Sequence, residues 1–469
     1  MVGVLCRAAY AQAVVDLRPD PGSTDPALLL ALHAAGRFAA DLRWADLPAP
    51  VQARTGLMLV DLLGVTAAGA RTPELVALRQ AWPAPAGPSA LVGAGRGTQP
   101  DTAAWLNGAA ACCLELDEGN KHAAGHPAAH VVFAVLAEAG AAPQPVAGTE
   151  LLAAVVAGYE VASRFGRATR RREDLHTHGH WGATGAGAAV GRLRGLPAEQ
   201  VSAALDAAGG LVYATPWSVV LAGSFVRNLW AAGSNVSGLV GARLAAAGLA
   251  GVEGSVGCTL GEVVGGLDVA PLTDGLGERW DLTGGYVKRH SSCSYTHPAA
   301  DAVLTLRARH RLGADDVDRI VVATHQLTMP LAGVATGSRL AAMFSLPYVV
   351  AVALRAGVVG PAEFSDAWRH DPDVLAVANR VQVLHDPELD ARLPAERAAR
   401  VTVVLRDGRE VTEEVPNPVG DVNHHPFTAE QVHAKAVALV GGQDADRVRR
   451  TVEALADAAD VRPLLADLP

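Results

Sequence analysis

The sequence predicts a mainly α-helical protein, with a large all-helical domain and a smaller α+β lid domain. Of the 469 residues, 50% are hydrophobic but only 4% are aromatic. The core must therefore consist of Ala, Leu and Val, a composition that favours closely packed helices. Apolar residues recur at helical spacing over about the first 280 residues, and β-branched runs come after them. A chain of this length also exceeds one ordinary hydrophobic core.

The helical region begins with apolar periodicity at residues 26–69 and 101–141. Connectors rich in Pro and Gly interrupt this periodicity at 83–88 and 143–145, which is typical of helix hairpins. Small residues are frequent in the helices that follow, so their backbones can approach closely. These further helices are predicted at 149–167, 182–193, 197–209 and 234–248.

The smaller domain is indicated by β-branched runs at 319–324 and 401–405. Asp407-Gly408 separates the second run from another at 410–415, which is a strong hairpin signal. Helical stretches at 299–309 and 344–355 lie between the runs. We therefore assign residues 285–415 to an α+β lid.

The C-terminal tail begins with Thr428-Ala-Glu-Gln431, a capping box that opens a last helical segment. We expect this tail to pack back onto the helical domain. The helical domain is therefore predicted to comprise residues 1–284 and 416–469.

Net charge and cysteine use limit the protein's partners. The formal charge of −9 argues against nucleic acid and against anionic membranes. Five cysteines without a C-x-x-C pair indicate a reducing compartment and no zinc or iron–sulfur signature. Arg7 comes too early for a signal-peptide core, and no apolar stretch reaches the roughly 20 residues that a membrane span needs. The prediction is a cytoplasmic protein.

The first dense polar stretch is Glu115-Leu-Asp-Glu-Gly-Asn-Lys-His122, followed by His126-Pro127. It places three carboxylates, one lysine and two histidines in an apolar neighbourhood. Burial and mutual repulsion would separate the carboxylate pKa values, as acid–base catalysis requires. A solvated acidic loop at a helix end explains the composition equally well.

A second polar group, His176-Thr-His-Gly-His180, precedes a helix rich in Gly and Ala. Alternating histidines suggest a metal, but no cysteine or carboxylate stands nearby at a familiar ligand spacing. A histidine at a helix N-terminus, suited to anions, is the better functional interpretation. We expect His178 and His180 to lie on a loop surface.

Two basic features admit structural explanations as well as functional ones. The arginine-rich run at 164–172 is typical of a solvated face or an interface. Arg227, just before a helix, is either structural or a bidentate carboxylate ligand.

The third polar stretch, Lys288-Arg-His-Ser-Ser-Cys-Ser-Tyr-Thr-His297, lies at the proposed domain boundary. It supplies positive charge and hydrogen-bond donors, and ligand sites gather at such boundaries. No G-x-S-x-G elbow accompanies its serines. An anion site is predicted, with a polar linker as the alternative.

Taken in order, these stretches resemble the 2-methylcitrate dehydratase (MmgE/PrpD) family, which also contains cis-aconitate decarboxylases. The resemblance covers nearly the whole chain and includes Asn107-Gly-Ala-Ala, Gly158-Tyr-Glu-Val161, Phe344-Ser-Leu-Pro-Tyr348 and Pro416-Asn-Pro418. It implies the same two-domain architecture and a homodimer. It also implies a catalytic pocket with these members: Asp117 or Glu115, His126, His176, Lys288, Cys293 and Tyr348.

Two departures from the family pattern concern the pocket. The usual Asp-Asp-Thr is replaced by Asp117-Glu118-Gly119, so a threonine hydroxyl is absent. A family lysine falls at Arg227, which keeps the charge but cannot lose its proton. These departures predict a substrate other than 2-methylcitrate itself.

The leading hypothesis is a lyase without cofactor or metal that removes water from a small di- or tricarboxylate. Lys288, Arg227 and Arg289 would bind the anion, together with Glu115 and Cys293. A base would take the proton next to the carboxylate, and an acid would protonate the departing hydroxide. The candidate bases are His126 and Asp117, and the candidate acids are His176 and Tyr348. Decarboxylation, epimerisation and a non-catalytic helical scaffold are the alternatives.

Overall fold

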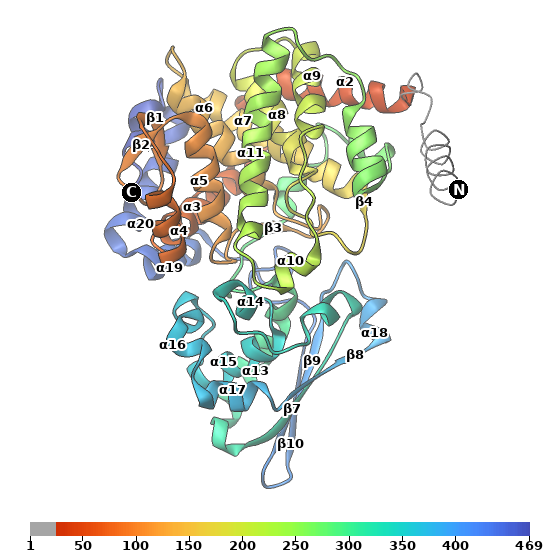
Figure 1. Cartoon of the computed structure of the whole chain (residues 1–469), viewed down its shortest axis with the longest axis vertical. Coiled ribbons are helices and arrows are strands. Elements are labelled where there is room, and N and C mark those ends of the chain that lie inside the picture. Colours follow the sequence, from red (N-terminus) through yellow and green to blue (C-terminus); the bar gives the residue numbers. More distant parts are fainter. Residues whose placement is uncertain (1–24) are drawn as a thin grey trace, which may run out of the picture.

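A helical body and a smaller part containing a β-sheet make up the computed structural model, which describes residues 25–469 (Figure 1). Cys6 and the N-terminal segment considered above lie outside the described residues. Helices account for most of the secondary structure, so the mainly α class is confirmed. The helices of the body are α2 (Pro26–Asp41), α3 (Ala49–Gly69), α4 (Pro73–Ala81), α5 (Pro100–Cys112), α6 (Pro127–Ala141), α7 (Gly148–Ala168), α8 (Gly182–Leu193), α9 (Ala198–Gly209), α10 (Trp217–Leu221), α11 (Val226–Ala246) and α12 (Ala270–Thr273).

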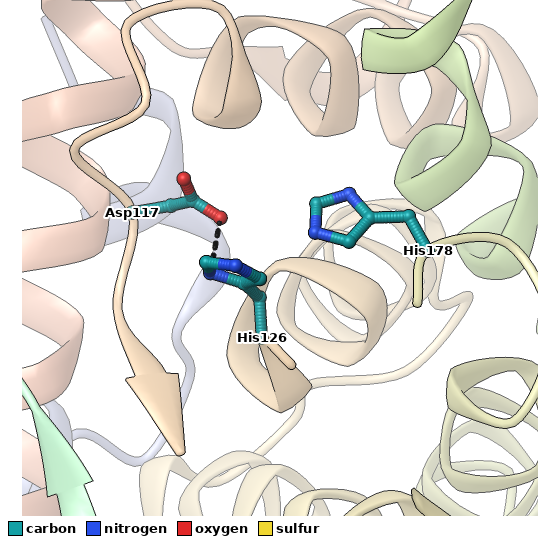
Figure 2. A group of neighbouring side chains, drawn as sticks. All are labelled: Asp117, His126 and His178. Carbon is teal, nitrogen blue, oxygen red and sulfur yellow. Dashed lines mark ion pairs between the residues drawn. The ribbon is translucent and has the colours of Figure 1, made fainter. Parts of the chain in front are cut away.

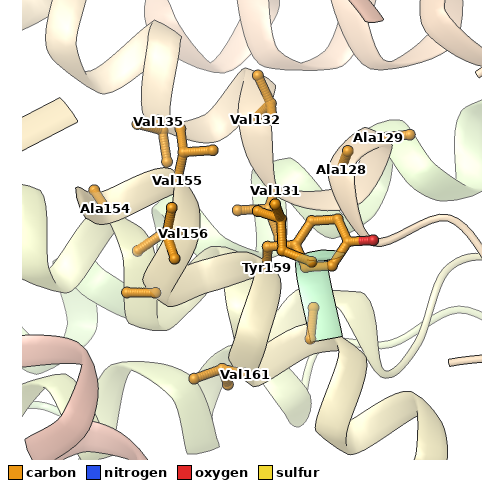
Figure 3. Packing of buried hydrophobic residues seen from close by; sticks show 14 of the residues in the cluster. Ala128, Ala129, Val131, Val132, Val135, Ala154, Val155, Val156, Tyr159 and Val161 are labelled. Atoms are coloured by element: carbon orange, nitrogen blue, oxygen red, sulfur yellow. The ribbon is translucent and has the colours of Figure 1, made fainter. Parts of the chain in front are cut away.

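Small residues allow the central helices of the body to pack closely. A Cβ on Gly185 of α8 would lie 2.2 Å from the carbonyl oxygen of Gly158 in α7, so these backbones touch at their crossing. Figure 3 shows valines of α6 and α7 meeting in the same core. Val131, Val155 and Val156 are fully buried. This packing fixes the loop that leads into α8, which carries the predicted histidines.

Several boundaries in the body differ from the sequence prediction, and α11 begins at Val226, well before the predicted start at residue 234. The helical stretch predicted at 26–69 is broken by a 3₁₀ turn at Trp44–Asp46, and Pro48 then caps α3. The connector predicted at 83–88 contains the start of β1 (Ala86–Leu91), which pairs with β2 (Arg96–Thr98). Proline signals the end of a helix but does not report the pairing that follows it.

The smaller part is a four-stranded sheet with helices packed against it (Figure 1). Its strand order is β10-β9-β7-β8, and the predicted hairpin at Asp407-Gly408 joins β9 to β10 in antiparallel register. The sequence missed β8, a short strand that pairs in parallel with β7. The strands are β7 (Val317–Thr324), β8 (Val381–His385), β9 (Ala399–Leu405) and β10 (Glu410–Val415), and the helices are α13 (His297–His310), α14 (Arg339–Met343), α15 (Leu346–Ala356), α16 (Asp366–Arg369), α17 (Pro372–Ala378) and α18 (Pro387–Asp390).

The C-terminal tail lies against the body, far in sequence from the helices it contacts (Figure 1). It forms α19 (Ala429–Val440), α20 (Gly442–Ala454) and α21 (Arg462–Ala466). The capping box at Thr428 is present as predicted. Val432 and Val448 belong to the same buried apolar cluster as Leu59 of α3. The division of the chain into two domains at 284/285 and 415/416 stays a prediction.

No single helix among residues 25–469 has both the length and the apolar character needed to cross a membrane. Together α3 and α4 would meet that test, but the chain bends by 74° between them. Most of α3 is buried in the body. The predicted cytoplasmic location and homodimer stay predictions.

Candidate active site

A short antiparallel pairing brings the two densest polar stretches together. β3 (Gly119–Asn120) pairs with β6 (Gly285–Tyr286), with Gly119 opposite Tyr286. Two residues further along this register, Asp117 stands opposite Lys288. Their Oδ1 and Nζ atoms lie 3.8 Å apart. The acidic loop that follows α5 therefore faces the predicted anion site.

Glu115 neutralises two buried cations. Its backbone has φ of +51°, a left-handed conformation that costs a residue with a side chain about 1–3 kcal/mol. One carboxylate oxygen pairs with Arg227, in the first turn of α11, and the other lies 3.2 Å from Lys288 Nζ. All three side chains are at most 1% exposed. Glu115 therefore compensates the charge of Arg227 and Lys288, and the direct substrate contact predicted for it stays a prediction.

His126 and Asp117 form a second pair (Figure 2). His126 precedes α6, and its Nδ1 lies 2.7 Å from the carbonyl oxygen of Glu118 and 3.1 Å from Asp117 Oδ2. Because both partners accept hydrogen bonds, Nδ1 carries a proton, and Nε2 is the nitrogen that can exchange one. Asp117 thus fixes the tautomer and orientation of His126.

The surrounding charges set the protonation of Asp117 and Lys288. Burial alone would raise the pKa of Asp117, but the charges of His126 and Lys288 outweigh it and hold that pKa well below its usual range. Burial would lower the pKa of Lys288, but Glu115 and Asp117 together raise it above its usual range. Asp117 is therefore a carboxylate and Lys288 an ammonium ion at neutral pH.

His176 is held as a neutral donor. Burial, followed by the charge of Arg227, lowers its pKa well below the usual value. The backbone N–H of His178 donates to Nδ1 of His176 over 3.2 Å, which leaves the ring proton on Nε2. A neutral imidazole of this tautomer can donate a hydrogen bond to an oxyanion.

A small pocket lies where these residues meet, between the body and the sheet-containing part. Of the predicted site residues, Glu115, His126, His176, Arg227, Lys288 and Cys293 line it, and Asp117 lies directly behind His126. Burial, and then the charge of Glu115, raises the pKa of Cys293 to about 11, so its thiol stays protonated at neutral pH.

Two predicted site residues lie elsewhere. The hydroxyl of Tyr348 donates to the carbonyl oxygen of Glu363 over 2.8 Å, and its ring is buried against Phe364. Arg289 is half-exposed and pairs with Asp301 over 3.0 Å. Neither lines the pocket, so we assign no catalytic or binding role to either. Both residues belong to polar or aromatic segments, and the sequence does not reveal which way their side chains point.

The expected surface position of His178 and His180 is wrong. Both are fully buried, and neither ring nitrogen of His178 has a hydrogen-bond partner. His178 packs edge-on against His126, His130 and His176. The loop before α8 turns inward, so its histidines line the core.

Asp117, His126 and His178 are the described residues that come nearest to a metal site (Figure 2). One ligand atom from each lies within 4.8 Å of the others. However, Asp117 already faces the Lys288 ammonium and the His126 ring. These contacts favour an ion-pair network over a cation, and the absence of a metal requirement stays a prediction.

The sequence missed several residues of the pocket. Arg171 of the arginine-rich run lines it, although this run was expected to be a solvated face or an interface. The only feature of the sequence that could have indicated a role for Arg171 in the pocket is its position close before the histidine loop. Trp217, Tyr286 and Arg397 also line the pocket and were not singled out in the sequence. Tyr295 and Phe344 line it as well; both belong to segments quoted above, but neither was given a role.

Tyr286 accounts for the glycine at position 119. A Cβ on Gly119 would lie 2.3 Å from the Tyr286 hydroxyl oxygen. A threonine in this position would therefore collide with the tyrosine. The phenol of Tyr286 borders the pocket and supplies a hydroxyl in this region.

Glu118 gives the folded protein a testable pH dependence. Burial raises its pKa to about 8, despite hydrogen bonds from Tyr159 and the Ala128 amide that act to lower it. In the unfolded chain this carboxyl ionises near 4.5. Between these pH values the unfolded chain binds fewer protons, so the free energy of unfolding falls as pH rises. We expect Glu118→Gln to reduce this fall by on the order of 2 kcal/mol.

Urea unfolding at pH 5 and pH 8 measures that slope for both proteins. Because glutamine also changes the hydrogen bonds, the pH slopes are compared and the absolute stabilities are not. Equal slopes would show that Glu118 ionises normally in the folded protein.

Comparisons with known proteins cover almost the entire chain. Residues 34–257 match the family model described as the MmgE/PrpD N-terminal domain, and residues 290–458 match the MmgE/PrpD C-terminal domain. A cis-aconitate decarboxylase of Aspergillus terreus (strain NIH 2624 / FGSC A1156) is 27% identical over 91% of this chain and 94% of its own length. The cis-aconitate decarboxylase-like protein oryM of Aspergillus oryzae is also 27% identical, with the same coverage.

Proposed function

Because the chain belongs to the MmgE/PrpD family, a family of lyases, we propose that it removes carbon dioxide from a small polycarboxylate such as cis-aconitate. The charge of the pocket is the observation that carries this proposal. Four cationic side chains line it, Arg171, Arg227, Lys288 and Arg397, against one carboxylate, Glu115. An excess of buried positive charge suits a ligand with several carboxylates. The similarity to cis-aconitate decarboxylases favours decarboxylation over the dehydration that the sequence first suggested.

The first task of the site is to stabilise negative charge. When the bond to the departing carboxylate breaks, its electron pair stays on the substrate carbon and spreads toward a neighbouring unsaturated or carboxylate group. Lys288 and Arg227 are fully buried, where water screens charge weakly. Their fixed positions offer this charge a preorganised environment. The Nε2–H of His176 would donate a hydrogen bond to the same charge.

The second task is to deliver a proton to carbon. In this proposal His126 Nε2 gives the proton, and its Nδ1 stays bound to Asp117 and the Glu118 carbonyl. Carbon dioxide leaves, the proton takes its place on carbon, and His126 regains a proton from water. No metal or organic cofactor takes part in the proposed steps.

Dehydration is the second candidate, and the Asp117–His126 pair favours it. A carboxylate that holds Nδ1–H leaves Nε2 as the nitrogen that can take a proton, as removal of a proton next to a carboxylate requires. Epimerisation would use the same base and return the proton to the other face.

The masses of the products distinguish these reactions. We expect the purified protein to convert cis-aconitate with loss of carbon dioxide, at an unchanged rate after treatment with a chelator. Parallel incubations with citrate and 2-methylcitrate, in deuterated water, test the alternatives. Loss of water, or a substrate that loses no group and gains only the mass of incorporated deuterium, would replace the proposed reaction. If no di- or tricarboxylate raised the Tm in a thermal-shift screen, that result would instead support the alternative that the protein is a non-catalytic helical scaffold.

A further inference from the structure

Within the described residues 25–469, Arg397 is a buried cation without an anionic partner. It lies just before β9 and is 7% exposed. Its guanidinium group is placed over two aromatic rings, 5.3 Å from the centroid of Tyr295 and 5.8 Å from that of Tyr286. Nη1 lies 3.5 Å from the Ser294 hydroxyl. No Asp or Glu oxygen of residues 25–469 lies within ion-pair distance of it.

Arg171 approaches the same pocket from the body. It ends β4 (Thr169–Arg171), and its Nη1 donates to the carbonyl oxygens of Arg172 and Leu175. These bonds orient the guanidinium group without neutralising it, and the carboxylate of Asp174 acts on its charge only from beyond ion-pair distance. Among the described residues, no carboxylate is within ion-pair distance of Arg171 either. The phenol of Tyr295 interacts electrostatically with both Arg171 and Arg397, which places it close to each of them.

The other two cations of the pocket differ in this respect. Arg227 and Lys288 share the carboxylate of Glu115, and Lys288 also faces Asp117. Their charges are therefore largely balanced before any ligand binds. The unbalanced positive charge lies at Arg171 and Arg397. A buried charge without a partner is costly, and natural proteins retain one where a ligand supplies the opposite charge.

We propose that Arg171 and Arg397 form a carboxylate-binding subsite, which holds the carboxylates of the ligand that do not react. This inference rests on the proposed function for the identity of the ligand. One arginine comes from the body and the other from the sheet-containing part, so one bound anion links them. Planar guanidinium groups bind carboxylates in a bidentate manner. The subsite therefore selects ligands with two or three carboxylates over those with one.

Ligand series of decreasing charge test the subsite. Calorimetry would measure the Kd of cis-aconitate, fumarate and crotonate for the native protein and for Arg397→Gln, Arg171→Gln and the double variant. Each single substitution is expected to weaken cis-aconitate binding about 10- to 100-fold, as loss of a charged hydrogen bond does. Crotonate binding should change less than threefold. Arg397→Lys keeps the positive charge but lacks the planar guanidinium group that binds a carboxylate through two hydrogen bonds. It should recover part of the affinity for cis-aconitate that Arg397→Gln loses.

Matched controls separate this effect from a general loss of positive charge. Arg172→Gln removes the exposed arginine next to Arg171, which pairs with Asp174. Arg400→Gln removes an arginine of β9 that pairs with Glu414. Both controls should bind all three ligands as the native protein does. Far-UV circular dichroism and the Tm without ligand identify any variant that fails to fold. If a glutamine variant does not fold, Arg397→Lys and Arg171→Lys replace it in the binding measurements.

The outcomes distinguish the subsite from the proposed function. If cis-aconitate is turned over and the arginine variants bind it as tightly as the native protein, the subsite is wrong and the function stands. If the variants lose polycarboxylate binding but the native protein turns over no polycarboxylate, the subsite stands and the function is wrong. Failure of the native protein to bind any polycarboxylate would overturn the subsite.

Discussion

Replacing His126 with asparagine is expected to lower kcat for cis-aconitate by a factor of about 10² to 10⁴, the usual contribution of a general acid or base. The asparagine amide can still donate to the Glu118 carbonyl, as His126 Nδ1 does over 2.7 Å. It has no counterpart of Nε2, so proton delivery is lost while the local fold is kept. Steady-state kinetics and a ligand titration measure kcat and Kd separately, and Kd should change much less than kcat.

His122→Asn is the matched control for this substitution. His122 lies in the same loop but is exposed, and it does not line the pocket. Its replacement should leave kcat within about twofold of the native value, as expected for a surface change. A His126→Asn protein that retains full turnover would remove His126 from the mechanism.

Replacing Glu115 with glutamine is expected to destabilise the protein by about 3–5 kcal/mol, the cost of breaking a buried ion pair from one side. Glutamine keeps the shape of the side chain but leaves Arg227 and Lys288 without their shared counter-charge. Both cations are fully buried, so water cannot replace the lost carboxylate. Denaturant unfolding measures the change in the free energy of unfolding.

Glu414→Gln supplies the comparison on the surface. Glu414 of β10 pairs with Arg400 of β9 and with Arg392 of the preceding loop, and all three side chains are about one-third exposed. Its loss should cost at most about 1 kcal/mol, because solvent screens such pairs. Similar losses for the two variants would mean that Glu115 does not act as the counter-charge of a buried pair.

The longer helices of the body were largely predictable from local patterns, whereas the short helices α4, α10 and α12 were not predicted. Apolar spacing identified α7, α8 and α9 within a few residues of their observed ends. The hairpin at Asp407-Gly408 and the capping box at Thr428 are local in the same sense, and both are present. By contrast, β8 is five residues long and mostly exposed, and its parallel pairing with β7 depends on a long crossover. No local signal marks such a strand.

Unusual residue chemistry in the sequence marked residues that line the pocket, but it did not predict which way each side chain points. Three polar stretches in an apolar chain marked most of the pocket, including His126, His176 and Lys288. Tyr348 also stands in a recognisable segment, but its hydroxyl turns to the carbonyl of Glu363. His178 was expected at the surface and lies in the core. Arg397 has no distinctive neighbours in the sequence and becomes visible only through its lack of a counter-charge.

The sequence alone therefore determined the helical class, many of the local elements and the polar stretches that line the pocket, because these depend on neighbours along the chain. The tertiary structure decided which charges meet. The pairing of Gly119 with Tyr286 places Asp117 opposite Lys288, and the start of α11 adds Arg227 to Glu115. These contacts join residues more than a hundred positions apart, and their energies depend on distance and burial, neither of which the order of the residues contains.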